Sequence, residues 1–214
     1  MHHLKVANLV EILVANGIDV EEDYKLEVNP RLLDDRAKSL LGELYHQLGG
    51  EGEAKLLDRM KFDFKIHGFL FVYDDAVHFN RYRAGTFKTS MYEVFTYSWL
   101  ASYKRLCRTY ERDCLKSGMA ERVWNGPPIA KKCFGQPSEP GDLGGVGAPG
   151  WRLNAYNDAQ YDLLTRLHGY KMVRIPMYET IMYGGSLKKI DQLLVQPKEE
   201  QHQAIIAWLQ RKTI

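Results

Sequence analysis

Residues 61–83 carry the side chains whose types and order are best suited to chemistry. Asp63 and Lys65 are the polar positions of the alternating segment FDFKI, and Asp74 ends the apolar run FLFVY. His78 follows four residues later. Carboxylate oxygens beside cationic groups are what a divalent cation and a phosphodiester both require. The segment therefore predicts either a site for metal-assisted chemistry on phosphate esters or a hairpin in which Asp74 and Asp75 only end the strand.

A β-hairpin over residues 62–74 is the element expected to position these groups. The alternation of FDFKI predicts a strand with one apolar face. The run FLFVY is apolar at every position, which is typical of a strand buried on both sides. His67 and Gly68 separate the two segments and predict the turn. The hairpin would thus bring two carboxylates, a lysine and a histidine to one end of a sheet.

Basic residues follow the hairpin in a chain whose formal net charge is only +2. Nucleic-acid binding therefore depends on a local patch rather than on global charge. A solvated helix face is the alternative explanation for the same charges. The predicted nucleic-acid contacts are Arg81, Arg83, Lys88, Arg105, Arg108, Lys131 and Lys132.

Apolar spacing and glycine or proline stops predict the remaining elements. The segment TSMYEVFTYSWLASYKRLCRTYERDCLKSG has aromatic residues at three- and four-residue steps and predicts one long helix. Glycine and proline punctuate residues 124–155, which are expected to form a loop inserted in the core. The other predicted elements are helices at 4–16, 31–48 and 157–168, a strand YKMVRI at 170–175, and two helices within 183–214.

This order of elements predicts an α/β fold with a central mixed β-sheet and flanking helices. The length of 214 residues predicts a single domain, with N-terminal helices over 1–60, a core over 61–182 and C-terminal helices over 183–214. Three cysteines without framework spacing predict reduced thiols and a cytoplasmic protein. No apolar stretch reaches membrane-spanning length, so we expect no membrane partner. The oligomeric state is left open.

Several of these residues follow the motif order of a known superfamily. Glu43 lies on an early helix, Asp63 on the first strand of the hairpin, and Asp74 at the end of the second, with His78 just beyond. The segment LLTRLHGYKMVRIP at 163–176 then forms a helix-and-strand unit. In these features the chain resembles the PD-(D/E)xK nuclease superfamily, in particular the compact branch that includes very-short-patch repair endonucleases.

The resemblance implies a restriction-endonuclease-like core and Mg²⁺- or Mn²⁺-dependent hydrolysis of phosphodiester bonds in DNA. Asp63 and Asp74 are then the expected metal ligands. Glu43 is expected to orient a water from its helix. Lys65 or His78 is expected to act as base or as charge stabiliser.

The chain also departs from the superfamily pattern. Val72 stands where an acid is usual, and no acid-x-Lys element follows the strand-end aspartate. One interpretation is that Lys65 supplies the missing ammonium. Another is that residues 63–65 are themselves the acid-x-Lys element, with Asp58 or Glu53 as the upstream acid. The third is that the site is catalytically degenerate and the fold acts as a nucleic-acid-binding or protein-interaction scaffold.

Overall fold

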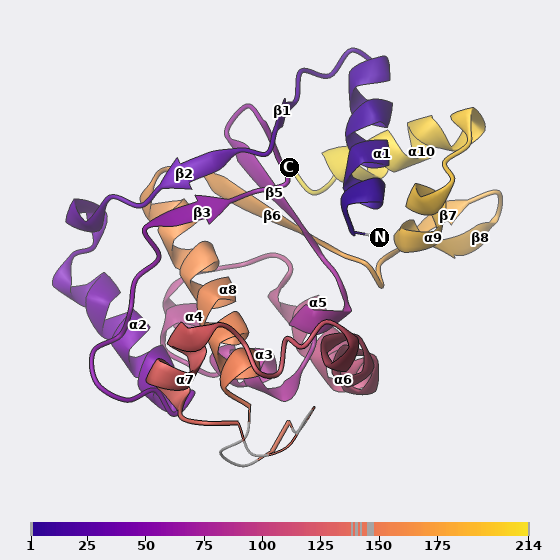
Figure 1. Cartoon of the computed structure of the whole chain (residues 1–214). Helices are drawn as coiled ribbons and strands as arrows, with labels where there is room; N and C mark the ends of the chain where they lie inside the picture. Colours follow the sequence, from indigo (N-terminus) through magenta and orange to yellow (C-terminus); the bar gives the residue numbers. More distant parts are fainter. Residues whose placement is uncertain (1, 138, 140, 142, 145–147, 214) are drawn as a thin grey trace. The chain divides into compact units, whose positions relative to one another are not determined.

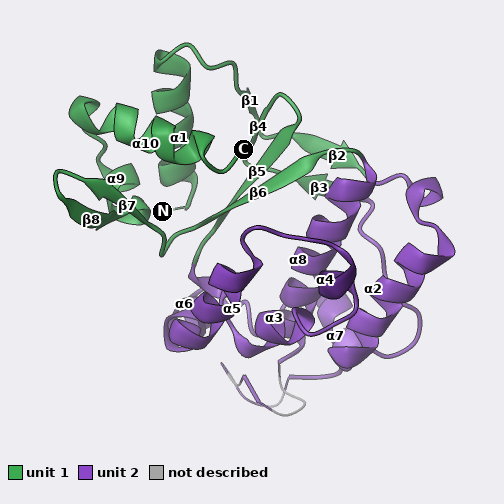
Figure 2. Ribbon diagram, turned by 180° about the vertical axis from the view of Figure 1, so that it is seen from behind, with its two compact units in different colours: residues 1–27, 59–75, 169–214 green, residues 28–58, 76–168 purple. Residues whose placement is uncertain are grey.

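The protein forms two compact units in a computed structural model that describes residues 2–137, 139, 141, 143, 144 and 148–213. Unit 1 comprises Met1–Glu27, Arg59–Asp75 and Gly169–Ile214. Unit 2 comprises Val28–Asp58 and Ala76–His168. Figure 2 shows the two units in different colours. The prediction of a single domain stays a prediction.

Unit 1 is an α/β unit built around the predicted hairpin. Its elements are α1 (His2–Ala15), β1 (Glu21–Glu22), β2 (Lys25–Glu27), β3 (Arg59–Lys61), β4 (Phe64–Ile66), β5 (Phe69–Asp74), β6 (Lys171–Pro176), β7 (Thr180–Tyr183), β8 (Ser186–Lys189), α9 (Ile190–Val195), the 3₁₀ turn η3 (Glu199–Gln201) and α10 (His202–Gln210).

The central sheet of unit 1 has the strand order β1-β4-β5-β6. Strands β4 and β5 pair antiparallel around a turn at His67, whose φ is 51°. Strand β6 runs parallel to β5, with Phe71 opposite Val173. Both the hairpin and the strand YKMVRI are therefore confirmed as members of one mixed sheet. Figure 1 shows β5 and β6 side by side.

One face of this sheet packs against helices. The Phe64 and Phe71 rings stack with centroids 4.5 Å apart, which the direct pairing of these residues in the antiparallel register allows. They belong to a core cluster that also contains Leu9 of α1, Leu194 of α9 and several apolar residues of α10, among them Ile205. The predicted combination of a central mixed sheet and flanking helices is confirmed.

The C-terminal part of unit 1 differs from the prediction of two helices. Residues Thr180–Tyr183 and Ser186–Lys189 form the β7–β8 hairpin, and α9 begins only at Ile190. Gly184 and Gly185 turn the chain with φ values of 58° and 74°. Such left-handed φ values favour glycine. The predicted last helix is confirmed as α10.

Unit 2 is helical. Its elements are the 3₁₀ turn η1 (Pro30–Leu32), α2 (Asp35–Gln47), the 3₁₀ turn η2 (Ala76–His78), α3 (Arg81–Thr86), α4 (Met91–Val94), α5 (Leu100–Thr109), α6 (Glu111–Ala120), α7 (Pro128–Phe134) and α8 (Pro149–Leu167). Helix α2 agrees with its prediction, and Asp34 caps its N-terminus by accepting a hydrogen bond from the Ala37 amide at 2.7 Å.

The prediction of one long helix over residues 89–117 is wrong. The chain forms α4, then an irregular segment, then α5 and α6, which meet at Tyr110. Within the irregular segment the Tyr97 hydroxyl donates to the Asp162 carbonyl, and its ring lies 5.1 Å from that of Trp99. Tertiary contacts of the aromatic side chains therefore override a helical periodicity that the aromatics themselves created.

The predicted loop over 124–155 is also wrong in part. Helix α7 starts at Pro128 and α8 at Pro149, and proline is well suited to the first position of a helix because it lacks an amide hydrogen. Pro128 and Pro149 thus mark the starts of two helices and not a continuous loop. Residues 138, 140, 142 and 145–147 of this segment lie outside the described residues.

The described residues contain no helix that is both long and apolar enough to cross a membrane. The three cysteines, Cys107, Cys114 and Cys133, are buried and carry free thiols.

Candidate functional site

Asp63 lies in the short break between β3 and β4, where the chain beside β5 leaves the regular strand pairing. The backbone between β3 and β4 bends at this position, and the Asp63 amide donates to the Phe71 carbonyl at 3.0 Å. The Asp63 side chain then takes over as acceptor, because its Oδ2 receives the Tyr73 amide at 2.6 Å. Its carboxylate is only 17% exposed. The sheet therefore holds a partly buried carboxylate in a defined orientation.

His2, at the start of α1, lies between two carboxylates of unit 1. Its Nε2 is 3.0 Å from Asp63 Oδ1, and its Nδ1 is 4.0 Å from Asp75 Oδ2. The imidazole packs edge-on against the Tyr73 ring, with centroids 5.5 Å apart. The His2 and Asp75 side chains are each 29% exposed, so solvent reaches this cluster.

Lys5 follows His2 by three residues in α1, and residues at this spacing lie on the same face of a helix. Its buried ammonium pairs with Asp191 at the start of α9 and lies 5.9 Å from the centre of the Tyr73 ring. The Tyr73 hydroxyl donates to the same Asp191 oxygen at 2.6 Å. Burial, followed by this hydrogen bond, raises the Tyr73 pKa well above its usual value of 10, so the phenol stays protonated.

We call Asp63, Asp75, His2, Lys5 and Asp191 the α1 cluster. All five residues belong to unit 1, and Tyr73 of β5 contacts four of them, Asp63 through its amide, His2 and Lys5 through its ring, and Asp191 through its hydroxyl. Sequence reasoning identified Asp63 but missed His2, Lys5 and Asp191, which are remote from it in sequence. The one available signal was Asp75, the second acid after the FLFVY strand.

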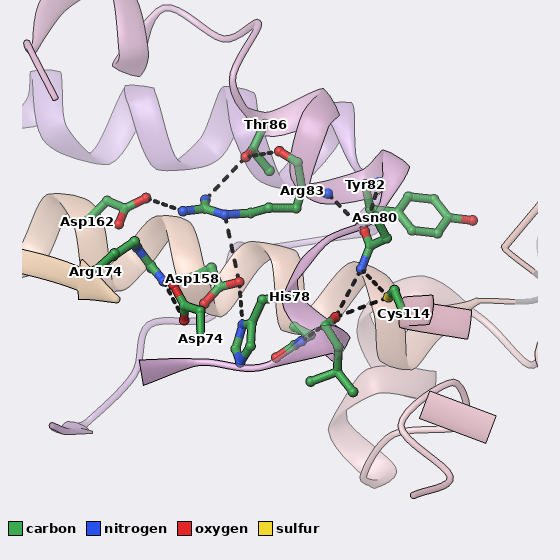
Figure 3. A network of polar contacts seen from close by, with 12 residues as sticks. Asp74, His78, Asn80, Tyr82, Arg83, Thr86, Cys114, Asp158, Asp162 and Arg174 are labelled. Carbon is green, nitrogen blue, oxygen red and sulfur yellow. Dashed lines mark hydrogen bonds and ion pairs between the residues drawn. The ribbon is translucent and has the colours of Figure 1, made fainter. Parts of the chain in front are cut away.

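Asp74 has a different environment. It lies on the sheet face that also carries Val72 and Arg174, since Val72 and Arg174 are directly paired in the β5–β6 register. Arg174 Nη1 donates to both Asp74 oxygens, at 3.0 and 2.7 Å, and both side chains are almost fully buried. Figure 3 shows this pair. Asp74 thus neutralises a buried arginine, whereas Asp63 contacts His2, and their predicted sharing of one cation stays a prediction.

Lys65 contacts neighbours other than Asp63. Its ammonium is 2.9 Å from Glu21 Oε2 and 4.5 Å from the centre of the Tyr24 ring. The hydrogen bond to Glu21 is the main reason that the Lys65 pKa is raised. These contacts place Lys65 in the β1–β4 pairing, and its predicted catalytic role stays a prediction.

Glu43 and His78 belong to unit 2. Glu43 is exposed, and its Oε1 accepts a hydrogen bond from the Ser90 amide at 3.2 Å, just before α4. His78 Nδ1 is 2.9 Å from Asp158 Oδ2. Asp158 is on α8, and its carboxylate is within hydrogen-bond distance of His78, which follows Asp75 by three residues.

Arg83, predicted to bind nucleic acid, is instead buried inside unit 2. Its Nη2 donates to Asp162 at 2.6 Å, and its Nε lies 3.7 Å from Asp158. Figure 3 shows the guanidinium reaching Asp162, Asp158 and Thr86. Tyr92 donates to Asp162 at 2.5 Å, and burial holds the Tyr92 pKa well above 10. A side chain with 1% exposure cannot contact a phosphate without rearrangement, so the Arg83 prediction is corrected to a structural ion pair.

The other predicted cationic residues also belong to unit 2. Arg81 is exposed but forms a two-point pair with Glu111, through Nε at 2.8 Å and Nη2 at 3.1 Å. Lys131 is half-buried, and the remaining members are exposed: Lys88, Arg105, Arg108 and Lys132. Their binding of nucleic acid stays a prediction.

Comparison with known proteins identifies a family but no activity. A family model described as a family of unknown function (DUF7255) matches residues 43–196. Searches of curated proteins and of solved structures find no match. The matched range includes Asp63, Asp75 and Asp191 of the α1 cluster, and it begins after His2 and Lys5.

Proposed function

Because the chain belongs to a family of unknown function, DUF7255, we propose its activity from its own side chains: metal-dependent hydrolysis of phosphodiester bonds in nucleic acid, with DNA as the expected substrate. The observation that carries this proposal is the solvent-accessible α1 cluster, in which the Asp63 carboxylate faces His2 with Asp75 on the far side of the ring.

The order of elements in unit 1 supports the proposal. Helix α1 is followed by β1, β4 and β5 as an antiparallel series, and the later β6 is parallel to β5. A mixed sheet of this kind supports the restriction-endonuclease-like core that the resemblance to the PD-(D/E)xK superfamily implies, while the early helix with Glu43 that the resemblance includes is α2 of unit 2. Asp63 stands immediately before β4, where the resemblance expects a catalytic aspartate.

The residues present fit a divalent cation. Asp63 Oδ1 and His2 Nε2 are 3.0 Å apart, close to the separation of about 3 Å between neighbouring ligands at about 2.1 Å from an octahedral ion. Such an ion would lower the pKa of a bound water and offset the charge of the reacting phosphate. Asp63 would hold it, and the Tyr73 amide keeps that carboxylate oriented.

The neighbouring groups can handle a proton and a negative charge. Asp75 is a partly exposed carboxylate able to accept a proton from an attacking water. The Lys5 ammonium, held against Asp191, supplies a positive charge on the same face of α1. We assign this charge-stabilising role to Lys5 in preference to Lys65, because Lys5 shares the α1 face with His2, whereas Lys65 lies in the β1–β4 pairing.

The direct test is cleavage of DNA and RNA, single- and double-stranded, with Mg²⁺ or Mn²⁺. Asp63→Asn keeps an oxygen acceptor for the Tyr73 amide but removes the charge, so we expect at least a 1,000-fold loss of cleavage in a folded protein. The matched control is Asp19→Asn, an exposed acid of the same unit, which should cleave like the wild type. Absence of cleavage by the wild type with every substrate and metal contradicts the proposal.

A second candidate is a non-catalytic nucleic-acid-binding protein. The observation that favours it is that Asp74 and Arg83, two residues expected in the site, form buried ion pairs with Arg174 and Asp162 instead. Here the surface cations of unit 2 should bind phosphates with an affinity that falls steeply with salt. Filter binding at two salt concentrations tests this. Replacing Lys131 and Lys132 of α7 by glutamine should weaken binding, whereas the same change at Lys188 and Lys189 of β8 should not.

A further inference from the structure

Both nitrogens of one imidazole face carboxylate oxygens in the α1 cluster. His2 Nε2 is 3.0 Å from Asp63 and Nδ1 is 4.0 Å from Asp75. Neutral histidine carries one ring proton, so Nε2 can act either as a donor or as a ligand, depending on which nitrogen is protonated. The sequence predicts no role for this residue.

The surroundings hold the ring in place. His2 begins α1, whose Leu9 and Leu13 are buried in the core of unit 1. The Tyr73 ring contacts the imidazole edge-on, and the Tyr73 amide anchors the Asp63 carboxylate. The same strand residue thus fixes both a nitrogen and an oxygen donor, which is the kind of support that a metal ligand needs.

We propose that His2 Nε2 and Asp63 Oδ1 together ligate one divalent cation of the Mn²⁺, Co²⁺ and Zn²⁺ class, and that Asp75 orients His2 through Nδ1. An imidazole donor favours these ions over Mg²⁺, which prefers oxygen ligands alone. With Nε2 on the metal, Nδ1 carries the ring proton and points at Asp75. A carboxylate that accepts a hydrogen bond from the free ring nitrogen commonly fixes the tautomer of a metal-bound histidine. Asp75 Oδ2, which is 4.0 Å from Nδ1, has to approach by about 1 Å to accept that bond.

Binding replaces a proton by the metal. In the hydrogen-bonded form with the donor on Nε2, that proton lies between His2 and Asp63. In neutral His2 the Nε2 proton passes to solvent and Nδ1 takes one from solvent, so the tautomer changes with no net release of protons. In protonated His2 the Nε2 proton is released to solvent and Nδ1 keeps its own. In both cases the cation meets one neutral nitrogen and one carboxylate oxygen. This proposal rests on the proposed function only for the choice of site, since metal binding can be measured without any nucleic acid.

The simpler explanation is a structural contact. Carboxylates are favoured near a helix N-terminus, and Asp63 and Asp75 both lie beside the first residue of α1. In that case the histidine and aspartates only hold α1 against β5. This explanation predicts no specific metal binding and becomes one outcome of the test.

The test measures Mg²⁺, Mn²⁺, Co²⁺ and Zn²⁺ affinity of the full chain without nucleic acid, using titration calorimetry and the visible absorption of Co²⁺. We expect affinity to rise from Mg²⁺ to Co²⁺. His2→Gln should weaken Co²⁺ binding at least 10-fold and leave Mg²⁺ binding within about 2-fold. His67→Asn, in the exposed turn between β4 and β5 of the same unit, is the matched control and should change neither. Asp75→Asn should weaken Co²⁺ binding about 10- to 100-fold.

A direct readout in the wild type protects the test against unfolded variants. Zn²⁺ should shift the ¹⁵N resonance of His2 Nε2 and leave Nδ1 protonated. Unchanged His2 resonances, or equal Co²⁺ affinity in wild type and His2→Gln, overturn the proposal. Metal binding that depends on His2 without any cleavage supports this inference and rejects the nuclease. Cleavage that is unaffected by His2→Gln, together with unshifted His2 resonances, supports the nuclease and rejects His2 as a metal ligand.

Discussion

Arg81 and Arg83 are two positions apart in the sequence, yet their environments differ completely. The Arg83 side chain is 1% exposed and pairs with the fully buried Asp162, whereas the Arg81 side chain is 56% exposed and pairs with Glu111. Removing one partner of a buried pair leaves an uncompensated charge, while an exposed pair contributes little because solvent screens it.

These environments predict different costs for two equivalent substitutions. Asp162→Asn should lower the free energy of unfolding by about 3–5 kcal/mol, because it leaves the Arg83 guanidinium buried without its closest anion. Glu111→Gln should lower it by less than about 1 kcal/mol. Urea denaturation of both variants checks this. Equal effects would mean that the Arg83–Asp162 pair contributes no more than a surface contact.

Cys114 carries a second prediction at this scale. Burial raises the pKa of its thiol to about 12, compared with about 8.5 in an unfolded chain. The folded thiol therefore stays protonated while the unfolded one ionises, so this contribution to stability is complete below about pH 8.5 and is lost as pH rises toward 12. Between pH 9 and 10 the loss amounts to about 1.4 kcal/mol per pH unit.

Cys114→Ala should remove this slope. The unfolding free energy of the wild type should fall more steeply between pH 9 and 10 than that of the variant, by about 1.4 kcal/mol per pH unit. The same burial predicts that iodoacetamide labels Cys114 in the unfolded chain and not in the folded one at pH 8.5. Labelling of the native protein, or parallel pH profiles, would contradict the raised pKa.

At the scale of elements, the close approach of α6 and α8 depends on a glycine. A Cβ placed on Gly118 of α6 would lie 1.8 Å from Cη2 of Trp151, which is fully buried on α8. Gly42 of α2 is also inside a helix, but nothing lies within 4 Å of the corresponding Cβ position. The two glycines therefore separate packing from helix propensity.

The same substitution should have opposite signs at these two positions. Gly42→Ala should stabilise the protein by about 0.5–1 kcal/mol, since alanine is the better helix former. Gly118→Ala should destabilise it by about 1–3 kcal/mol, because Trp151 has to leave its rotamer or α6 has to shift. Thermal melts of both variants check the signs. A stabilised Gly118→Ala protein would show that α6 and α8 are not in close contact.

At the scale of the whole molecule, the chain passes between the two units four times. Residues 28–58 leave unit 1 after β2 and return at β3, and these two strands pair with each other. Residues 76–168 leave after β5 and return shortly before β6, which are also paired. Unit 1 thus closes both loops from which unit 2 is made.

This connectivity predicts that the units unfold together. Loss of the β2–β3 and β5–β6 pairs would release the ends of both segments of unit 2 and return the entropy of loop closure. Trp208 of unit 1 and Trp151 of unit 2, each as the only tryptophan in a variant, should report the same urea midpoint. Two separated midpoints would contradict the prediction of a single domain.

The sequence by itself determined the elements whose signal is local. The alternation of FDFKI, the apolar run FLFVY and the segment YKMVRI predicted β4, β5 and β6. The order of apolar and polar residues along a short segment is enough to indicate which faces of a strand are buried. The turn at His67 and the end of α2 close to residue 48 were readable for the same reason, whereas α2 begins at Asp35 and not at the expected residue 31. Asp63 was recognisable as a candidate because an acid between two core phenylalanines needs a partner.

Only the tertiary structure decided which partners these residues have. His2 meets Asp63 across 61 positions and Lys5 meets Asp191 across 186, and no local pattern encodes such contacts. The burial of Arg83 and the division of residues 89–117 into three helices follow from packing around Asp162. Charge and hydrophobic periodicity are properties of one residue or one segment. A functional site forms where several segments meet, and which segments meet depends on how strands and helices pack over the whole chain.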